Sequence, residues 1–256
     1  MVDHTKTRED CARYFGLSGS EKIPERAVVV PILCDAFNLG EYLTDFEYAF
    51  NRHLPNIGVC KGKYKGAPVT MLVCGIGSWT ASESMDAAGL LGFEKALFFG
   101  SCGAIDEGLE RGDFVVTTRA YESMFNEKIC PDDVLPETME RVKGAYADRE
   151  VILALERELG KRGIPFRKGE TYSTDAEYRQ EEVMLEALRK RGYLALDREH
   201  RTVLDGFSGD RTKAGALMYV TDRIGKETPS TTNYWVFAKE CLETCYPVVF
   251  DALVSD

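Results

Sequence analysis

The sequence predicts an α/β fold in which helices and strands are layered. Short apolar runs alternate along the chain with amphipathic, helix-like segments, which favours this arrangement over an all-helical bundle or an all-β sandwich. The 256 residues are 44% hydrophobic and 29% charged, so the chain can bury a substantial core. No repeat, low-complexity tract or long linker interrupts it. We therefore expect one domain over residues 1–256, with residues 1–12 as a flexible N-terminal tail.

The expected elements follow from apolar runs, periodicity and turn residues. The expected strands are Ala27–Leu33, Val69–Val73, Lys95–Phe99, Asp113–Thr117 and Ala214–Thr221, with a hairpin around Gly62–Gly66. The expected helices are Glu41–Phe50, Ser78–Leu91, Arg149–Arg162, Glu181–Arg191 and Thr231–Cys245. Ser78 is placed to cap the second helix, Gly92 to end it, and Pro247 to end the last. Asn126–Glu140, which contains two prolines and two aspartates, is expected to be an exposed loop.

The charge balance excludes broad classes of partner. Lys and Arg number 32 against 42 Asp and Glu, which gives a net charge of −10. This balance disfavours duplex nucleic acid and anionic membrane surfaces, which are bound chiefly through Lys and Arg. The N-terminus has no apolar signal region, and no apolar stretch approaches the ~20 residues that span a bilayer. We expect a cytoplasmic protein that binds neither nucleic acid nor a membrane.

The cysteines and histidines predict neither a disulfide framework nor a metal site. The eight cysteines are widely spaced, as reduced and mostly buried thiols are in a cytoplasmic chain. The close pair Cys241 and Cys245 has no neighbouring histidine or second pair that would complete a zinc site. His4, His53 and His200 form no ligand spacing, and we expect each in a mobile tail or at the surface. No metal or organic cofactor is implied.

Three turns that follow expected strands are candidate ligand-binding segments: Cys34–Asn38, Cys74–Ser78 and Phe99–Ala104. In open α/β sheets, ligands bind at such turns because backbone N–H groups and helix N-termini converge there. A tight turn that requires glycine is an adequate alternative for each turn alone. Gly75 and Gly77 do not form a dinucleotide fingerprint, since its third glycine would fall at Thr80.

Two carboxylates also stand out. Glu199 lies in the segment Leu196–His200, just before an apolar stretch, and Asp222 ends an apolar strand. A solvated surface carboxylate is the simpler interpretation of either residue alone. The three turns and two carboxylates, in this order, are less easily explained that way.

Together these motifs resemble the nucleoside phosphorylase family, which includes uridine phosphorylases, hexameric purine nucleoside phosphorylases and methylthioadenosine/adenosylhomocysteine nucleosidases. The most specific motifs are Gly75–Gly77, Gly100–Ile105, Gly112–Val116, Leu196–Glu199 and Val220–Asp222. The resemblance implies a single three-layer α/β domain with a central mixed sheet flanked by helices. It also implies a homo-oligomer, a dimer or hexamer, with sites near subunit contacts. The implied partners are a nucleoside-like substrate, and phosphate or water as the acceptor.

The resemblance assigns roles to individual residues. Glu199 would bind the ribose hydroxyls, because a carboxylate accepts hydrogen bonds from two adjacent hydroxyls. Asp222 would protonate the leaving base, since an acid near the base nitrogen helps the base depart. Ser101 matches the residue that touches ribose and phosphate or nucleophile, and Gly75 and Gly77 form a substrate-binding turn.

The phosphate-binding arginines of the family have no counterparts at two positions. Phosphorylases hold phosphate with arginines because a guanidinium matches an oxyanion bidentately. Asn38 and Phe98 occupy two of these positions, and the third falls near Leu54 and Pro55, with His53 and Arg52 close by. Each lost charge-assisted hydrogen bond costs roughly 1.5–3 kcal/mol, enough together to weaken phosphate binding by orders of magnitude. Water would suit a pocket lined by Phe98 and Asn38 better than phosphate.

The nucleoside side of the expected site has changed as well. Arg198 replaces a methionine, Glu177 replaces the aromatic residue before Tyr178, and Tyr14 replaces a histidine that some members donate across the subunit interface. Arg198 forms either a surface ion pair or a contact with an anionic group such as a 5′-phosphate. Arg223 orients the acid, helps bind an anion, or belongs to a solvated loop.

The favoured function is an enzyme that cleaves the N-glycosidic bond of a nucleoside or related compound to free base and sugar or sugar phosphate, with hydrolysis expected. The alternative is a nucleoside-binding or sensing protein that kept the scaffold and lost turnover. The altered binding positions favour this alternative, and the retained carboxylates argue against it.

Overall fold

A computed structural model describes residues 6–54, 56–122, 144–175, 182–208, 211–226 and 234–255. Its strands are β1 (Arg26–Val30), β2 (Thr44–Phe50), β3 (Gly58–Tyr64), β4 (Ala67–Val73), β5 (Lys95–Ala104), β6 (Phe114–Glu122), β7 (Ala145–Tyr146), β8 (Phe166–Ser173), β9 (Ala195–Asp197) and β10 (Lys213–Arg223). Its helices are α1 (Arg8–Tyr14), α2 (Leu33–Gly40), α3 (Ser78–Ala88), α5 (Arg149–Lys161), α6 (Glu182–Lys190), α7 (His200–Gly206) and α8 (Tyr234–Val254).

The strands form one mixed, ten-stranded sheet in the order β10-β6-β8-β9-β5-β1-β4-β3-β2, with β7 paired to β6. β10 also pairs with β5, so the pairings from β10 through β6, β8, β9 and β5 form a closed ring. The pairs β1–β4, β1–β5 and β5–β10 are parallel. The segments that follow these four strands therefore leave the sheet at the same edge, where open α/β sheets bind ligands.

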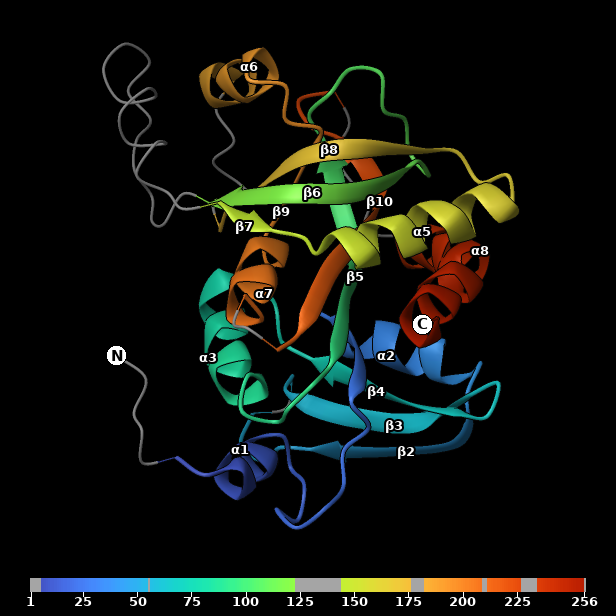
Figure 1. Ribbon diagram of the computed structural model, residues 1–256. Coiled ribbons are helices and arrows are strands. Elements are labelled where there is room, and N and C mark those ends of the chain that lie inside the picture. Colours follow the sequence, from blue (N-terminus) through green and yellow to red (C-terminus); the bar gives the residue numbers. More distant parts are fainter. Residues whose placement is uncertain are drawn as a thin grey trace.

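Helices cover both faces of the sheet (Figure 1). One apolar cluster joins α1, α3 and α7 to the sheet, and a second joins α2, α5 and α8 to it. A smaller cluster packs α6 against Ile105 and Tyr172. The predicted mixed α/β architecture, with a central sheet flanked by helices, is confirmed.

The predicted strands and hairpin are confirmed with small shifts in their ends. The β3–β4 hairpin turns at Lys65 and Gly66, whose φ angles are 49° and 84°. Two successive positive φ values match the twist of the flanking strands. Helices α2 and α7 and the short or polar strands β7, β8 and β9 were not predicted from the sequence.

Two predictions around α2 were wrong. The segment Cys34–Asn38, expected to be a turn, lies within α2. The predicted helix Glu41–Phe50 is mainly the strand β2, which pairs with β3 in antiparallel fashion. Its aromatic residues recur every second position, and Phe46, Tyr48 and Phe50 make ring contacts with Phe37 of α2. This period of two is the pattern of a strand.

Helix ends also differ from the predictions. α8 continues through Pro247 to Val254, because buried residues beyond the proline, among them Val248 and Phe250, pack into the core. That packing outweighs the roughly 3 kcal/mol that an internal proline costs a helix. The expected N-terminal tail is helical from Arg8 onward, where Thr7 caps α1. The predicted loop Asn126–Glu140 lies outside the described residues.

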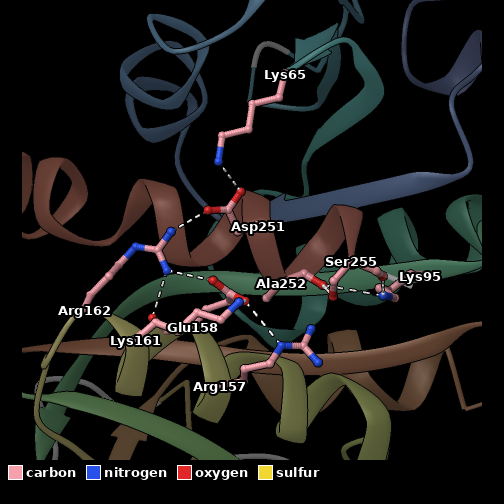
Figure 2. A network of polar contacts seen from close by, with 9 residues as sticks. All are labelled: Lys65, Lys95, Arg157, Glu158, Lys161, Arg162, Asp251, Ala252 and Ser255. Atoms are coloured by element: carbon pink, nitrogen blue, oxygen red, sulfur yellow. Dashed lines mark hydrogen bonds and ion pairs between the residues drawn. The ribbon is translucent and has the colours of Figure 1, made fainter.

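A network of charged side chains ties α5 to α8 and to the β3–β4 hairpin (Figure 2). Arg162 bonds both Glu158, at 2.8 Å, and Asp251, which also accepts a hydrogen bond from Lys65 at 2.7 Å. Burial raises the pKa of Glu158, but hydrogen bonds from Lys161 and Arg162 outweigh this effect and lower the pKa to about 2. The network therefore stabilises the ionised carboxylate.

Candidate active site

The turn between β4 and α3 supplies backbone donors at the edge of the sheet where open α/β folds bind ligands. Gly75 and Gly77 have φ angles of 81° and 89°, which side-chain-bearing residues rarely adopt. A Cβ atom on Gly77 would lie 2.9 Å from Oδ1 of Asp175. Gly77, not Ser78, is the N-cap of α3, and the Ser78 hydroxyl donates to the Arg198 carbonyl at 2.7 Å. The predicted capping role of Ser78 was therefore wrong.

Carboxylates of the chain itself occupy the N-terminus of α3. Gly77 N–H donates to Oε1 of Glu199 at 2.5 Å, and Ser78 N–H donates to Oδ1 of Asp175 at 2.9 Å. The first N–H groups of a helix have no partners within the helix and favour negative charge. Glu199 is only 5% exposed, which excludes the alternative of a solvated surface carboxylate.

Burial changes the ionisation of Glu199. Desolvation raises the pKa of this carboxyl to about 8, and the negative charge of Asp197 acts in the same direction. The Gly77 N–H and the Arg198 guanidinium oppose the rise without cancelling it. Glu199 therefore keeps its proton to a higher pH than an ordinary glutamate does. Hydrogen-bond donors from a ligand would favour its ionised form.

A buried polar network lies directly behind Glu199. Oδ2 of Asp197 accepts the backbone N–H groups of Glu199 and His200, at 3.1 and 2.8 Å. Oδ1 of Asp197 accepts the hydroxyl of Ser173 at 2.6 Å and also bonds Nδ1 of His200. Nε2 of His200 meets Oγ1 of Thr171 at 2.6 Å. His200 is fully buried, so the prediction of a surface or tail histidine was wrong.

Thr171, His200 and Asp197 are linked by hydrogen bonds in the order of a hydroxyl, imidazole and carboxylate triad. Such a triad needs a hydroxyl that a substrate can reach. Thr171 and His200 are both 0% exposed, and Thr171 also bonds Thr117 at 3.2 Å. This arrangement supports the fold behind the site and does not supply a nucleophile.

The second predicted carboxylate, Asp222, lies beside β5. It pairs with Gly103 across a register shift that follows Val220. Gly103 also pairs with Leu196 on the opposite side, so the end of β5 lies between Asp222 and the strand leading to Glu199. Asp222 is half-buried, and the Thr221 hydroxyl donates to its Oδ1 at 2.8 Å.

Ser101 lies on β5, beside β10, and the two candidate arginines are the sequence neighbours of the two carboxylates. Ser101 is half-buried on β5, opposite Tyr219 of β10. The Arg198 guanidinium approaches the turn before α3. One of its nitrogens lies 3.5 Å from the position that a Cβ on Gly77 would take. Arg223 forms an ion pair with exposed Glu110 at 2.8 Å.

Three further predicted binding residues come from other elements of the fold. Phe98 is 1% exposed, and its ring packs 6.1 Å from that of His200, in the cluster with α3 and α7. Asn38 is half-buried on α2, whose apolar residues pack on the other face of the sheet. Tyr14 ends α1 and packs against the apolar cluster that holds α1 and α3, and its carbonyl accepts a hydrogen bond from Asn51 at 2.8 Å.

Some site residues were not predicted from the sequence, and others lie outside the described residues. Glu177 and Tyr178 fall outside the described residues. Asp175 was not predicted, although it is only two positions before Glu177. Asp197 and His200 were given no functional role, although both stand within the segment Leu196–His200.

Nothing in the described ranges indicates a metal centre or a membrane span. Among these residues no group of three His, Cys, Asp or Glu side chains is placed to bind a metal ion. No described helix is long and apolar enough to cross a bilayer. The described cysteines, which leave out Cys130, are free thiols.

Known proteins share the sequence pattern and the fold. Residues 32–245 match the family model described as the phosphorylase superfamily. The uridine phosphorylase of Thermococcus kodakarensis is 31% identical over 169 residues, which span 66% of this chain but only 53% of that protein. A DeoD-type 1 purine nucleoside phosphorylase from Vibrio cholerae is 27% identical over 175 residues, 66% of this chain and 68% of the relative.

The fold comparison covers more of the chain. A crystal structure of uridine phosphorylase from Vibrio fischeri ES114, complexed with 6-hydroxy-1-naphthoic acid, superposes with a TM-score of 0.72. The match covers 91% of this chain and 90% of that one at 18% sequence identity. At this identity the likeness concerns the fold alone.

Proposed function

Because the chain belongs to the phosphorylase superfamily, we propose that it cleaves the N-glycosidic bond of a nucleoside or related compound and releases the free base. The observation that carries the proposal is the buried Glu199, held by Gly77, together with Asp222, which pairs with Gly103 of β5 opposite Leu196 of the segment that leads to Glu199. The relatives named above are uridine and purine nucleoside phosphorylases, which act on this class of compound.

Glu199 binds the sugar in this proposal. Two adjacent ribose hydroxyls donate to its carboxylate, which a backbone N–H already holds in place. These donors favour ionisation of a carboxyl whose pKa burial has raised to about 8. Sugar binding and ionisation of Glu199 are thereby linked, so a sugar that lacks these hydroxyls leaves the carboxyl protonated.

Asp222 is the general acid of the reaction. The electron pair of the bond between C1′ and the base nitrogen leaves with the base, and Asp222 gives its proton to that base. The oxygen of the acceptor forms the new bond to C1′. When the acceptor is water, the proton that it loses restores Asp222. The half-buried position of Asp222 lets it contact a ligand while limiting solvation.

We infer that the acceptor is water rather than phosphate. Asn38 and Phe98 stand where phosphorylases of this family carry arginine, and Phe98 is buried in the core. The N-terminus of α3, a common kind of anion site, is occupied by Glu199 and Asp175. Each missing charge-assisted hydrogen bond removes roughly 1.5–3 kcal/mol of binding free energy.

Purified protein incubated with a panel of purine and pyrimidine nucleosides, with and without phosphate, tests the proposal by release of free base. We expect release from at least one nucleoside without phosphate, and loss of that release in Asp222→Asn. Strict dependence on phosphate would contradict the inference about water.

The second candidate is a binding or sensing protein, favoured by the departures at Arg198 and at the two arginine positions. It predicts thermal stabilisation by a nucleoside without base release. No release from any member of the panel would reject the proposed enzyme. Stabilisation alone would then favour the binding protein.

A further inference from the structure

We propose that Asp197 and His200 form a positioning pair that caps α7 in place of Glu199 and so leaves the Glu199 carboxylate free to hold the sugar. This role rests on the proposed function of Glu199. Neither residue of the pair touches the substrate in this scheme, since the polar atoms of both side chains are engaged by Thr171, Ser173, backbone N–H groups and each other.

The start of α7 is capped in an unusual way. Glu199 is the N-cap residue, with φ −132° and ψ −34°, and its own side chain makes no capping hydrogen bond. N-cap residues normally use a short side chain to accept the free N–H groups of the first turn. Here Oδ2 of Asp197 instead accepts the N–H groups of Glu199 and His200, at 3.1 and 2.8 Å. The Glu199 side chain is released to reach Gly77 at 2.5 Å.

His200 fixes the Asp197 carboxylate from the other side. Its Nδ1 bonds Oδ1 of Asp197, and its Nε2 bonds Thr171 at 2.6 Å. Ser173 adds a third contact, because its hydroxyl donates to Oδ1 of Asp197 at 2.6 Å. Buried hydrogen bonds of this kind hold side chains in one arrangement. Strands β8 and β9 and the first turn of α7 are thus locked together directly behind Glu199.

The pair also acts on Glu199 through charge. The negative charge of Asp197 is the strongest charge effect raising the pKa of Glu199, after burial itself. The other groups that face Glu199 are Asp175 and the Cys74 thiol, the Arg198 guanidinium, and the backbone N–H at the start of α3. Removing the charge of Asp197 should therefore lower the pKa of Glu199. A carboxylate of the same helix that does not face Glu199 would leave this pKa unchanged when its charge is removed.

The test compares Asp197→Asn with Asp205→Asn, a control on the exposed side of the same helix. Carboxyl-carbon NMR of glutamate-labelled protein follows the titration of Glu199, whose signal is assigned by its loss in Glu199→Gln. For Asp197→Asn we expect the titration midpoint to fall by about one pH unit. We also expect kcat/KM for base release to fall by about 10- to 100-fold. The Asp205→Asn control should leave both unchanged.

The outcomes separate this inference from the proposed function. If the wild-type protein releases no base, the proposed function fails, while the titration still tests the pair. A folded Asp197→Asn protein whose Glu199 midpoint matches that of Asp205→Asn would overturn the positioning role. If Asp197→Asn does not fold, Ser173→Ala takes its place, since it removes one contact to Asp197 but not its charge. In that variant kcat/KM should be about 3- to 10-fold lower than in the wild type. Unchanged kinetics would reject the positioning role of Asp197 and His200.

Discussion

Replacing Glu199 with glutamine should make the protein more stable at high pH. Burial raises the pKa of this carboxyl from 4.5 to about 8, so between these values the folded protein binds a proton that the unfolded chain releases. Folding stability must therefore fall as pH rises through this window. The full shift corresponds to about 4–5 kcal/mol at about 1.4 kcal/mol per pH unit. Relaxation around the buried charge reduces the expected effect to about 2–3 kcal/mol.

Urea unfolding followed by circular dichroism, from about pH 5 to about pH 9, measures this effect. The glutamine amide in Glu199→Gln keeps the size of the side chain and an oxygen for the Gly77 N–H. Wild type and variant should be about equally stable near pH 5, and the variant should lead by about 2–3 kcal/mol near pH 9. Asp35, whose pKa burial raises to about 7, contributes equally to both proteins and cancels in the difference.

The control for this comparison is Glu41→Gln, which alters an exposed carboxylate. It should track the wild type at every pH. The difference in unfolding free energy between Glu199→Gln and the wild type should grow with pH. A difference that stays constant, or that favours the wild type at high pH, would refute the buried, protonated state of Glu199. The same variant should lose base release, because a neutral amide cannot accept from two hydroxyls as a carboxylate does.

Three further predictions concern the acid, the turn and the α5 network. Asp222→Asn should lower kcat for base release by about 10²- to 10⁴-fold. A riboside with a p-nitrophenoxide leaving group, which needs no protonation, should restore most of the rate. If the rate is not restored, the acid role of Asp222 is contradicted. Gly77→Ala should lower unfolding free energy by about 1–3 kcal/mol through its positive φ and the clash with Asp175; unfolding free energy equal to the wild type would contradict this. Glu158→Gln should lower the unfolding free energy by about 1–3 kcal/mol at neutral pH. Because the pKa of Glu158 is lowered in the folded state, urea unfolding should show this loss disappear as pH falls from 4.5 through about 2. A difference between variant and wild type that stays constant with pH would reject the ionic contribution.

The strands at the centre of the sheet could be predicted because each is a continuous apolar run. β1, β4 and β10 are buried along most of their length, so nearly every residue must be apolar. β8 was missed because its first half is polar and its last residues, Thr171 and Ser173, turn hydroxyls toward a buried histidine. β9 has only three residues, too few for a pattern.

The site could be predicted in part for a similar reason. Glu199, Asp222 and the Gly77 turn lie in short motifs that a sequence displays directly. The role of His200 depends on Thr171 and Ser173, which are far away in the chain and meet it only through the pairing of β8 with β9. The burial of Phe98 likewise follows from helices that pack over β5. Long-range packing decides such positions, and no local pattern reports it.

The identity of the acceptor is tested most directly by isotope transfer. The protein is incubated with a nucleoside that it cleaves, in water enriched in the heavy oxygen isotope and with phosphate present, and the sugar product is analysed by mass spectrometry. Hydrolysis with Asn38 and Phe98 in place of arginines predicts a free sugar that carries the heavy oxygen at C1′. A sugar 1-phosphate with no heavy oxygen on C1′ would contradict the account.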